Sequence, residues 1–556
     1  MADKSFGVRQ LNILGSGTPS IDSQGDLNLN ANKVAISTDV TVGGASTFTG
    51  NITANGNIIG DSSTNISGIN SVTATCFFGC GAGLTGIDAG FDPDAQNNLV
   101  AGTCAGQSLD SDTCFNIILG SCAARCLNSG DSNIVMGKQA GTQLTSGCYN
   151  IFFGDCAGKN TTTGKYNLAL GTSALANGTV SGNYNTAFGN QAGWNVCSGS
   201  HNFFGGYKAG YCVTTGSCNI AIGKQAGGGT SNSAATGSQN VSIGNGAAQE
   251  LTSGGCNTAV GYLAGFEHTT GCHNVTMGAL AGHQICTGSY NIAFGYYAGC
   301  DIKTGSSNIM IGQCAGRNRE NTSNNIFIGK DAGCCEGTGS NNIGIGQDVL
   351  KGAGGSHEYN IALGNYAGRG LTDGDHNILL GRCSGSNLTT GDNNIFLGNE
   401  AGGSNAVTCD HNILIGCAAG KFICSGDNNV AIGCGAAHAI TTAQYMVAIG
   451  KEAGLCNTTS EANIFIGCGA GKCLTTGYSN IYLGHSAGLS QGVLGNANHN
   501  IALGSQAGQA NSSGVGNIFI GKKTGNCQTT ASRSIFIGCY AGKYGSGSVW
   551  YNIVQG

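Results

Sequence analysis

Proline and charged side chains are both scarce in this chain of 556 residues. Proline occurs twice, and charged residues make up 9% of the chain, against about 25% in an ordinary soluble domain. So little charge leaves few residues for the solvated faces of helices. The net charge is −5 and no basic run occurs, which argues against nucleic acid or an anionic membrane as a partner.

Long apolar runs are missing as well. The first residues, MADKSFGVRQLNILG, have neither the apolar core nor the small-residue cleavage site of a signal peptide. No stretch approaches the roughly 20 uninterrupted apolar residues that cross a bilayer. We therefore expect a soluble protein that does not insert into membranes and does not use the general secretory route.

Glycine, in contrast, supplies 100 residues, far above the usual share of about 7%. The near absence of proline and of a strict triplet period excludes collagen, and the 40% apolar content argues against disorder. The glycines belong to a phrase, N-I-x-φ-G-x-x-A-G (φ, apolar), that recurs 27 times from Asn98 to the end of the chain. The step is usually 17 residues, sometimes 18, and lengthens to 21 before Asn240 and to 20 before Asn500. Asn leads every copy except those that begin at Met446 and Ser534, and Gly is always fifth.

Each copy has the pattern of one rung of a solenoid. In the copy that begins at Asn291, a short strand stops at Gly295, an Ala298-Gly299 step follows, and a polar connector ends at Gly305. Glycines at fixed offsets suit corners that need positive φ or a close backbone approach. The sequence therefore predicts an all-β fold, a parallel β-solenoid of 17-residue repeats about 4.8 Å apart and roughly 120 Å long. The leading Asn side chains are expected to bond along the stack as an amide ladder.

The strands are apolar on both faces, which indicates burial on both. We assign the second and fourth positions, such as Ile309 and Ile311, to one face and the third position to the opposite face. Because a slim solenoid covers only its inner face, we predict that the third positions form a stripe buried between copies of the chain in a homotrimer. The predicted trimer-interface residues are Phe152, Met310, Phe327, Leu379, Phe396, Leu414, Phe465, Tyr482, Phe519 and Phe536.

Three phrases, NIAIGKQAG (219–227), NNVAIGCGA (428–436) and MVAIGKEAG (446–454), resemble the S-V-A-I-G-x-x-A repeat of YadA-like trimeric adhesin heads. The resemblance covers 98–556 and implies a left-handed parallel β-roll with one repeat per turn in an intertwined homotrimer. This chain has a longer unit, with an added Thr/Gly connector. The secretion signal and membrane barrel of trimeric autotransporters are not found in it.

Residues 1–97 differ from the repeats. DLNLNANKVAISTDVTVGGASTFTGNITANGNI (26–58) and FFGCGAGLTGI (77–87) resemble modules of tail-fibre and other structural proteins from tailed phages, particularly myoviruses of marine cyanobacteria. The resemblance implies an N-terminal attachment segment (1–25) that binds virion tail or baseplate proteins. A β-rich stalk (26–97) would follow it, then the repeats (98–556).

The chain has 28 cysteines without a C-x-x-C motif. Cys substitutes well for Ser or Ala as a small, packable residue, which is the interpretation we favour. The alternative is cross-linking, because three pairs share an offset on successive rungs and a spacing of about 4.8 Å suits a disulfide. The candidate inter-rung pairs are Cys104 with Cys122, Cys417 with Cys434, and Cys456 with Cys473.

Four carboxylates, Asp375, Asp392, Asp410 and Asp427, each lie two residues before the leading Asn of successive rungs. Carboxylates about 5 Å apart repel by roughly 1 kcal/mol in water and about 3 kcal/mol near a protein surface. A Ca²⁺ ion would relieve this repulsion, so the four are candidate metal ligands. Splayed, solvated side chains would relieve it too, and we therefore predict neither a metal nor a cofactor.

No catalytic grouping of a nucleophile, His and carboxylate is apparent, and we predict a protein that is not an enzyme. The favoured function is a homotrimeric structural fibre of a phage virion that contributes to adhesion to a host-surface receptor. Such a fibre would assemble in the host cytoplasm and lie on the virion, outside the cell, when mature. One alternative is a bacterial trimeric surface adhesin or extracellular fibre. Another is an ice-binding solenoid built on the connector threonines.

Overall fold

The computed structural model describes most of the repeat region, namely residues 93–228, 234–335, 337–352, 354–403, 406–489, 496–544 and 550–556. The predicted attachment segment (1–25) and nearly all of the predicted stalk (26–97) lie outside the described residues. Within the described residues there are 27 strands of three residues each and no helix. No helix of that part of the chain is therefore long and apolar enough to cross a membrane.

The strands are β1 (Leu99–Ala101), β2 (Ile117–Leu119), β3 (Ile134–Met136), β4 (Ile151–Phe153), β5 (Leu168–Leu170), β6 (Thr186–Phe188), β7 (Phe203–Gly205), β8 (Ile220–Ile222), β9 (Val241–Ile243), β10 (Thr258–Val260), β11 (Val275–Met277), β12 (Ile292–Phe294), β13 (Ile309–Ile311), β14 (Ile326–Ile328), β15 (Ile343–Ile345), β16 (Ile361–Leu363), β17 (Ile378–Leu380), β18 (Ile395–Leu397), β19 (Ile413–Ile415), β20 (Val430–Ile432), β21 (Val447–Ile449), β22 (Ile464–Ile466), β23 (Ile481–Leu483), β24 (Ile501–Leu503), β25 (Ile518–Ile520), β26 (Ile535–Ile537) and β27 (Ile553–Gln555).

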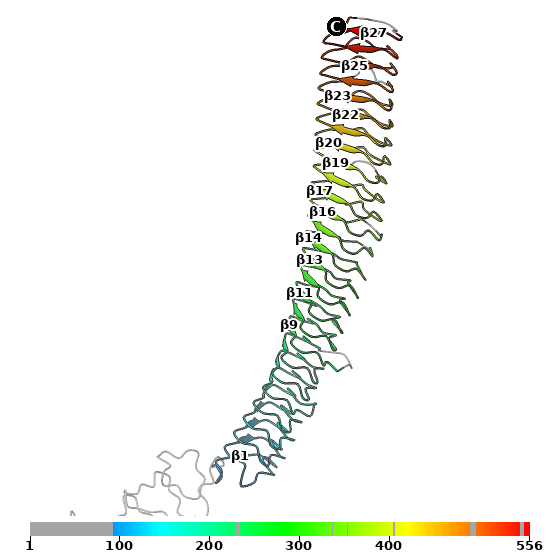
Figure 1. Ribbon diagram of the computed structural model, residues 1–556. Helices are drawn as coiled ribbons and strands as arrows, with labels where there is room; N and C mark the ends of the chain where they lie inside the picture. The colour runs from blue at the N-terminus through cyan, green and yellow to red at the C-terminus, as the bar shows by residue number, and fades with distance from the viewer. Residues whose placement is uncertain are drawn as a thin grey trace, which may run out of the picture. The chain divides into compact units, whose positions relative to one another are not determined.

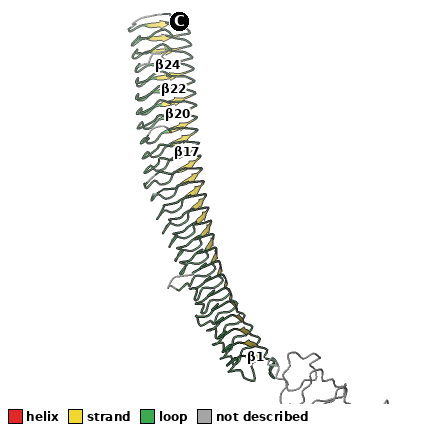
Figure 2. Ribbon diagram, turned by 180° about the vertical axis from the view of Figure 1, so that it is seen from behind, coloured by secondary structure: helices red, strands yellow, loops and turns green. Residues whose placement is uncertain are grey.

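All 27 strands belong to one parallel sheet in which each strand pairs with the strand of the next rung. Figure 1 shows them stacked from β1 to β27, and Figure 2 shows the strands in one column with loops and turns completing each coil. The longest step does not interrupt the ladder, since Ile220 of β8 pairs with Val241 of β9. The predicted parallel β-solenoid with one repeat per turn is confirmed.

Glycine ends each strand because the next rung leaves no room for a side chain. Gly295, which follows β12, has a φ of 135°, a conformation that L side chains rarely adopt. A Cβ there would lie 2.5 Å from the carbonyl oxygen of Gly312 in the next rung. The other end of the strand has a left-handed corner as well, at the residue before the leading Asn, but there the side chain points away from the coil. Tyr290, with a φ of 60°, is an example.

The leading Asn residues form the predicted amide ladder. The backbone N–H of Asn308 donates to Oδ1 of Asn291 at 3.0 Å, and its Nδ2 donates to the same oxygen at 3.0 Å. Nδ2 also donates to the carbonyl of Thr322 in the following connector at 2.7 Å. Asn308 is buried, so each of these bonds replaces one that water would otherwise make. Met446, which replaces Asn, still donates its backbone N–H to Asn429 at 3.0 Å.

The core contains the third position of the repeat, which is the middle residue of each strand. The prediction that these residues lie at a trimer interface is therefore wrong. The leading Asn points into the coil, and since strand side chains alternate, the third position points inward and the second and fourth point outward. The core is completed by the Ala that follows the turn in most rungs and by an apolar corner residue, such as Leu144 or Ile285. The residues predicted at the interface are at most 1% exposed, namely Phe152, Met310, Phe327, Leu379, Phe396, Leu414, Phe465, Tyr482, Phe519 and Phe536.

Removing one amide from the ladder is expected to destabilise the rungs beside it. Asn308→Ala leaves the carbonyl of Thr322 and the backbone N–H of Asn325 without their partners inside the coil. We expect a loss of at least about 2 kcal/mol in the opening free energy of these rungs, measured by native-state hydrogen exchange. Asn321→Ala, at an exposed connector site, should change it by less than about 0.5 kcal/mol. Equal effects of the two substitutions would contradict a structural role for the ladder.

His268 occupies the corner position that Leu251 and Ile285 fill in the neighbouring rungs, and neither ring nitrogen has a hydrogen-bond partner. Burial lowers its pKa from 6.5 to about 4. The unfolded chain therefore takes up a proton below pH 6.5 that the folded chain rejects, and stability falls as the pH drops from 6.5 to 4. This single group accounts for a loss of up to about 3 kcal/mol.

His268→Leu is expected to raise the urea midpoint of these rungs and to weaken its dependence on pH between 6.5 and 4. His357, whose pKa is also lowered to about 4 by burial and then by Arg319, remains in the variant and keeps its own contribution. The measurement compares the wild type and the variant at pH 7 and pH 4.5. If the urea midpoint of the variant fell between pH 7 and pH 4.5 by as much as that of the wild type, the burial of a neutral His268 would be contradicted.

Candidate functional site: the outer face of the sheet

The outward-facing side chains of the strands form one long face that is apolar except at Thr186, Thr258 and Gln555. In β12, Ile292 is 38% exposed and Phe294 51%, whereas Ala293 between them is buried. The same alternation recurs in every strand from β2 to β26, and none of the described strand residues carries a charge. We call the second and fourth positions of the repeat, which are the first and last residues of each strand β1–β27, the outer face.

Aromatic residues extend the outer face on both sides. On one side, the left-handed corner before the leading Asn carries exposed tyrosines such as Tyr290, Tyr359 and Tyr445. On the other side, Tyr207 and Tyr262 directly follow the glycine that ends the strand, and both are exposed. Most of the large apolar side chains that the described residues expose lie on the outer face or on these two borders.

The outer face is far larger than the apolar patches of monomeric proteins. Its 27 strands, about 4.8 Å apart and about 10 Å wide, give an area of roughly 1,250 Å² before the borders are counted. The largest apolar patch of a monomer is usually about 300–600 Å². A standard protein–protein interface buries about 800 Å² on each partner. The outer face is thus wide and long enough to be an interface.

The ion pairs lie outside the strands, in the turns and connectors, although Arg382, which pairs with Glu400, directly follows the glycine that ends β17. Lys303 pairs with Glu320 at 2.7 Å and Lys472 with Glu452 at 2.6 Å, and each pair joins successive rungs through the turns and connectors. These side chains are substantially exposed, so each pair adds little stability. The described strand residues are therefore uncharged, whereas charged side chains begin at the position after the strand glycine, as at Lys224, Lys330 and Arg382.

The aspartates predicted as candidate metal ligands form a second hydrogen-bonded ladder. The carboxylate of Asp392 accepts the backbone N–H of Asp375 at 2.7 Å, Asp410 accepts from Asp392 at 2.8 Å, and Asp427 accepts from Asp410 at 2.8 Å. One oxygen of each of these carboxylates is therefore held by the backbone of the preceding rung. No set of three or more His, Cys, Asp or Glu among the described residues is arranged to hold a metal.

Other rungs use different side chains at the same position, a pattern that the sequence analysis missed. The hydroxyl of Ser306 accepts the backbone N–H of Ser289 at 3.0 Å, and Ser323 accepts from Ser306 at 3.0 Å. The thiol of Cys272 accepts from Gly255 at 3.3 Å. The position therefore selects any short side chain with an acceptor atom. The recurrence of Ser, Asp, Asn and Cys two residues before the leading Asn was the signal in the sequence.

No disulfide joins the cysteines of the three candidate pairs in the structure. Cys104 and Cys122 occupy left-handed corners, with φ of 57° and 56°. The thiols of Cys456 and Cys473 are neighbours, and burial, followed by the charge of Cys473, raises the pKa of Cys456. The two interpretations of the cysteines, small packing residues or inter-rung disulfides, stay predictions.

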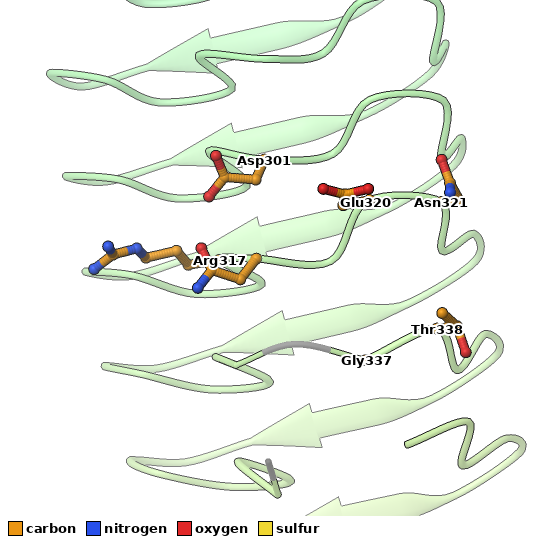
Figure 3. Close-up of a pocket in the computed structure, with 7 residues that line it drawn as sticks. Asp301, Arg317, Glu320, Asn321, Gly337 and Thr338 are labelled. Carbon is orange, nitrogen blue, oxygen red and sulfur yellow. The ribbon is translucent and has the colours of Figure 1, made fainter. Parts of the chain in front are cut away.

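A hollow of about 650 Å³ lies on the connector side, lined by Asp301, Arg317, Asn318, Glu320, Asn321, Gly337 and Thr338. Figure 3 shows these residues spread over three successive rungs, with Arg317 directed away from Glu320. Arg317 instead lies over the ring of Tyr297 at 5.1 Å, and Glu320 is held by Lys303. The hollow is open, and neither His nor Cys is among the residues that line it. We find no reaction that this set of side chains would catalyse.

Comparison with protein-family models, with curated proteins and with solved structures finds no match to this chain. The functional argument therefore depends on the geometry of the solenoid. The largest feature of that geometry is the outer face.

The Asp ladder provides a test that separates structural from metal-binding roles. Asp392→Ser keeps an acceptor for the backbone N–H of Asp375, as Ser306 does for Ser289, so we expect the thermal midpoint to change little. Asp392→Ala removes the acceptor and should cost about 1 kcal/mol. The measurement is thermal unfolding with and without millimolar Ca²⁺. Stabilisation of the wild type by Ca²⁺ that Asp392→Ser abolishes would contradict the structural role.

Proposed function

We propose that this protein is a structural fibre subunit whose copies associate side by side through the outer face, as a homotrimer. The observation that carries the proposal is the length of the outer face, an uncharged, largely apolar surface that runs over 27 strands. Water-exposed apolar surface costs roughly 25 cal/mol per Å², so covering it is strongly favourable. In this proposal the interface consists of the second and fourth positions of the repeat. The sequence analysis had assigned it to the third position.

Three-fold association agrees with the shape of the face. Each chain has one narrow apolar side, and three such sides arranged around a common axis cover one another in a closed rotational assembly. The ion pairs of the turns and connectors would then face solvent on the outside of the fibre. The resemblance of 98–556 to YadA-like trimeric adhesin heads supports the same stoichiometry.

The biological setting that we favour is a virion appendage of a tailed phage. Its support is the resemblance of 26–58 and 77–87 to modules of phage tail fibres. In this proposal the N-terminal region binds tail or baseplate proteins, and the repeats present many identical weak contacts to a host surface, which together give avidity. The protein would act mechanically and adhesively and not as an enzyme.

Two alternatives remain in different classes. A bacterial surface adhesin would use the same outer face for assembly. An ice-binding solenoid would need a flat array of free threonine hydroxyls, but the connector hydroxyl of Thr252 donates to the carbonyl of Thr269 at 2.8 Å, and that of Thr269 to Cys286 at 2.8 Å. Detection of the chain by mass spectrometry in purified phage particles would favour the virion. Its recovery only from bacterial cell surfaces would favour the adhesin.

The assembly is tested by the mass in solution. We expect the purified protein to sediment with about three times the 55.5 kDa of one chain at micromolar concentration. A variant with hydroxyls on the outer face carries Ser in place of Ile292, Ile309, Ile311 and Ile345, and its core is unchanged. We expect these substitutions to weaken the assembly at least tenfold. Lys303→Ser with Glu320→Ser, on the polar side, should leave the mass unchanged. A monomeric wild type at this concentration would refute the proposal.

A further inference from the structure

Side-by-side association of solenoids raises a problem of axial register. Ile309, Ile326 and Ile343 occupy the same column of the outer face in three successive strands. Sliding one copy along another by one rung, about 4.8 Å, therefore replaces one isoleucine by the next and makes nearly the same contacts. Repetitive apolar surfaces specify register weakly. A fibre whose copies end at the same height needs a feature that does not repeat.

The outer face has such a feature on β4–β7. Phe153 is 54% exposed, Phe188 60% and Phe203 41%, and all three lie at outward strand positions. At the described outward positions of the other strands there is a single further phenylalanine, Phe294 on β12. The bulkiest side chains of the outer face are thus concentrated on four rungs near one end of the ladder.

The border of the same rungs is aromatic too. Tyr149, Tyr166, Tyr184 and His201 stack face to face along the rod, with ring centroids 4.9, 4.8 and 4.9 Å apart. Because their faces are used within the column, these rings present edges and polar atoms outward. A sugar ring that stacks on an aromatic face would find no free face between them. Edges suit packing against another protein surface.

The surface of these rungs also has relief. Phe188 pairs in register with Gly205, which has no side chain of its own. The ring of Phe203 extends over Gly205, where an added Cβ would lie 3.3 Å from Cε1 of that ring. This arrangement of projecting rings around an outward-facing glycine does not recur in the aliphatic rungs β13–β26.

We infer that an aromatic band fixes the axial register between copies of this chain. The band consists of three outer-face residues, Phe153, Phe188 and Phe203, and of the stacked rings of Tyr149, Tyr166, Tyr184 and His201 beside them. The inference rests on the proposed side-by-side assembly. Rotation about an axis parallel to the rod places the same rung of every copy at the same height, so the band of each copy meets the bands of the others. Aromatic rings pack against one another in specific geometries, and a slip of one rung would separate the bands.

The test uses a photo-crosslinking residue, p-benzoylphenylalanine, in place of Ile345 on β15, which is 40% exposed and distant from the band. Mass spectrometry of the cross-linked peptides then reports which rung of the partner lies opposite. Phe153→Leu, Phe188→Leu and Phe203→Leu, combined, retain apolar side chains for association but remove the aromatic bulk. A matched control carries Ile466→Leu, Ile520→Leu and Ile537→Leu, which are exposed outer-face positions beyond the band.

In the wild type and in the control, we expect cross-links from position 345 mainly to the partner's β14–β16. In the band variant, the share of cross-links to strands two or more rungs away should rise several-fold while the sedimenting mass stays unchanged. An unchanged pattern in the band variant would overturn the inference. Loss of assembly in a band variant that keeps its far-UV circular dichroism would overturn it too, because the band would then supply affinity and not register. A monomeric wild type would instead refute the proposed assembly itself.

Discussion

The structure depends on a buried amide that nearly every rung shares with the next. The Oδ1 atom of one leading Asn accepts both the backbone and the side-chain N–H of the following Asn, as between Asn291 and Asn308. These bonds fix the spacing of the rungs and point the first position of the repeat, the Asn before each strand, into the coil. Since strand side chains alternate, the third position follows it into the core and the second and fourth are left outside. The apolar outer face is therefore a direct consequence of the ladder.

The fold was predictable because its determinants are local and repeated. The glycine at the fifth position and the short apolar strand recur in each copy, and the leading Asn in all but two, so the sequence predicted the parallel solenoid and the amide ladder. The orientation of the strands was not read correctly, because the residues on both faces are apolar and hydrophobicity alone does not distinguish them. The buried Asn was the missing clue, since it requires the third position, such as Phe327, to share its side.

Other features could not be derived from residue types alone. The acceptor role of Asp375 and Asp392 depends on the backbone of the neighbouring rung, which the sequence does not reveal. The stacking of Tyr149 on Tyr166 depends on a left-handed corner that holds both rings at the height of their own rungs. Repetition determines the solenoid, whereas departures from repetition determine where the surface differs. The aromatic band is one such departure.

The central claim is that copies of the chain cover one another's outer face. A cross-section of the purified protein by electron cryomicroscopy tests it most directly, because the strands occupy one side of each coil. Side-by-side association predicts three coils around an axis, with the strands on the inside and the connectors on the outside. A single coil, or coils whose strands face solvent, would contradict it.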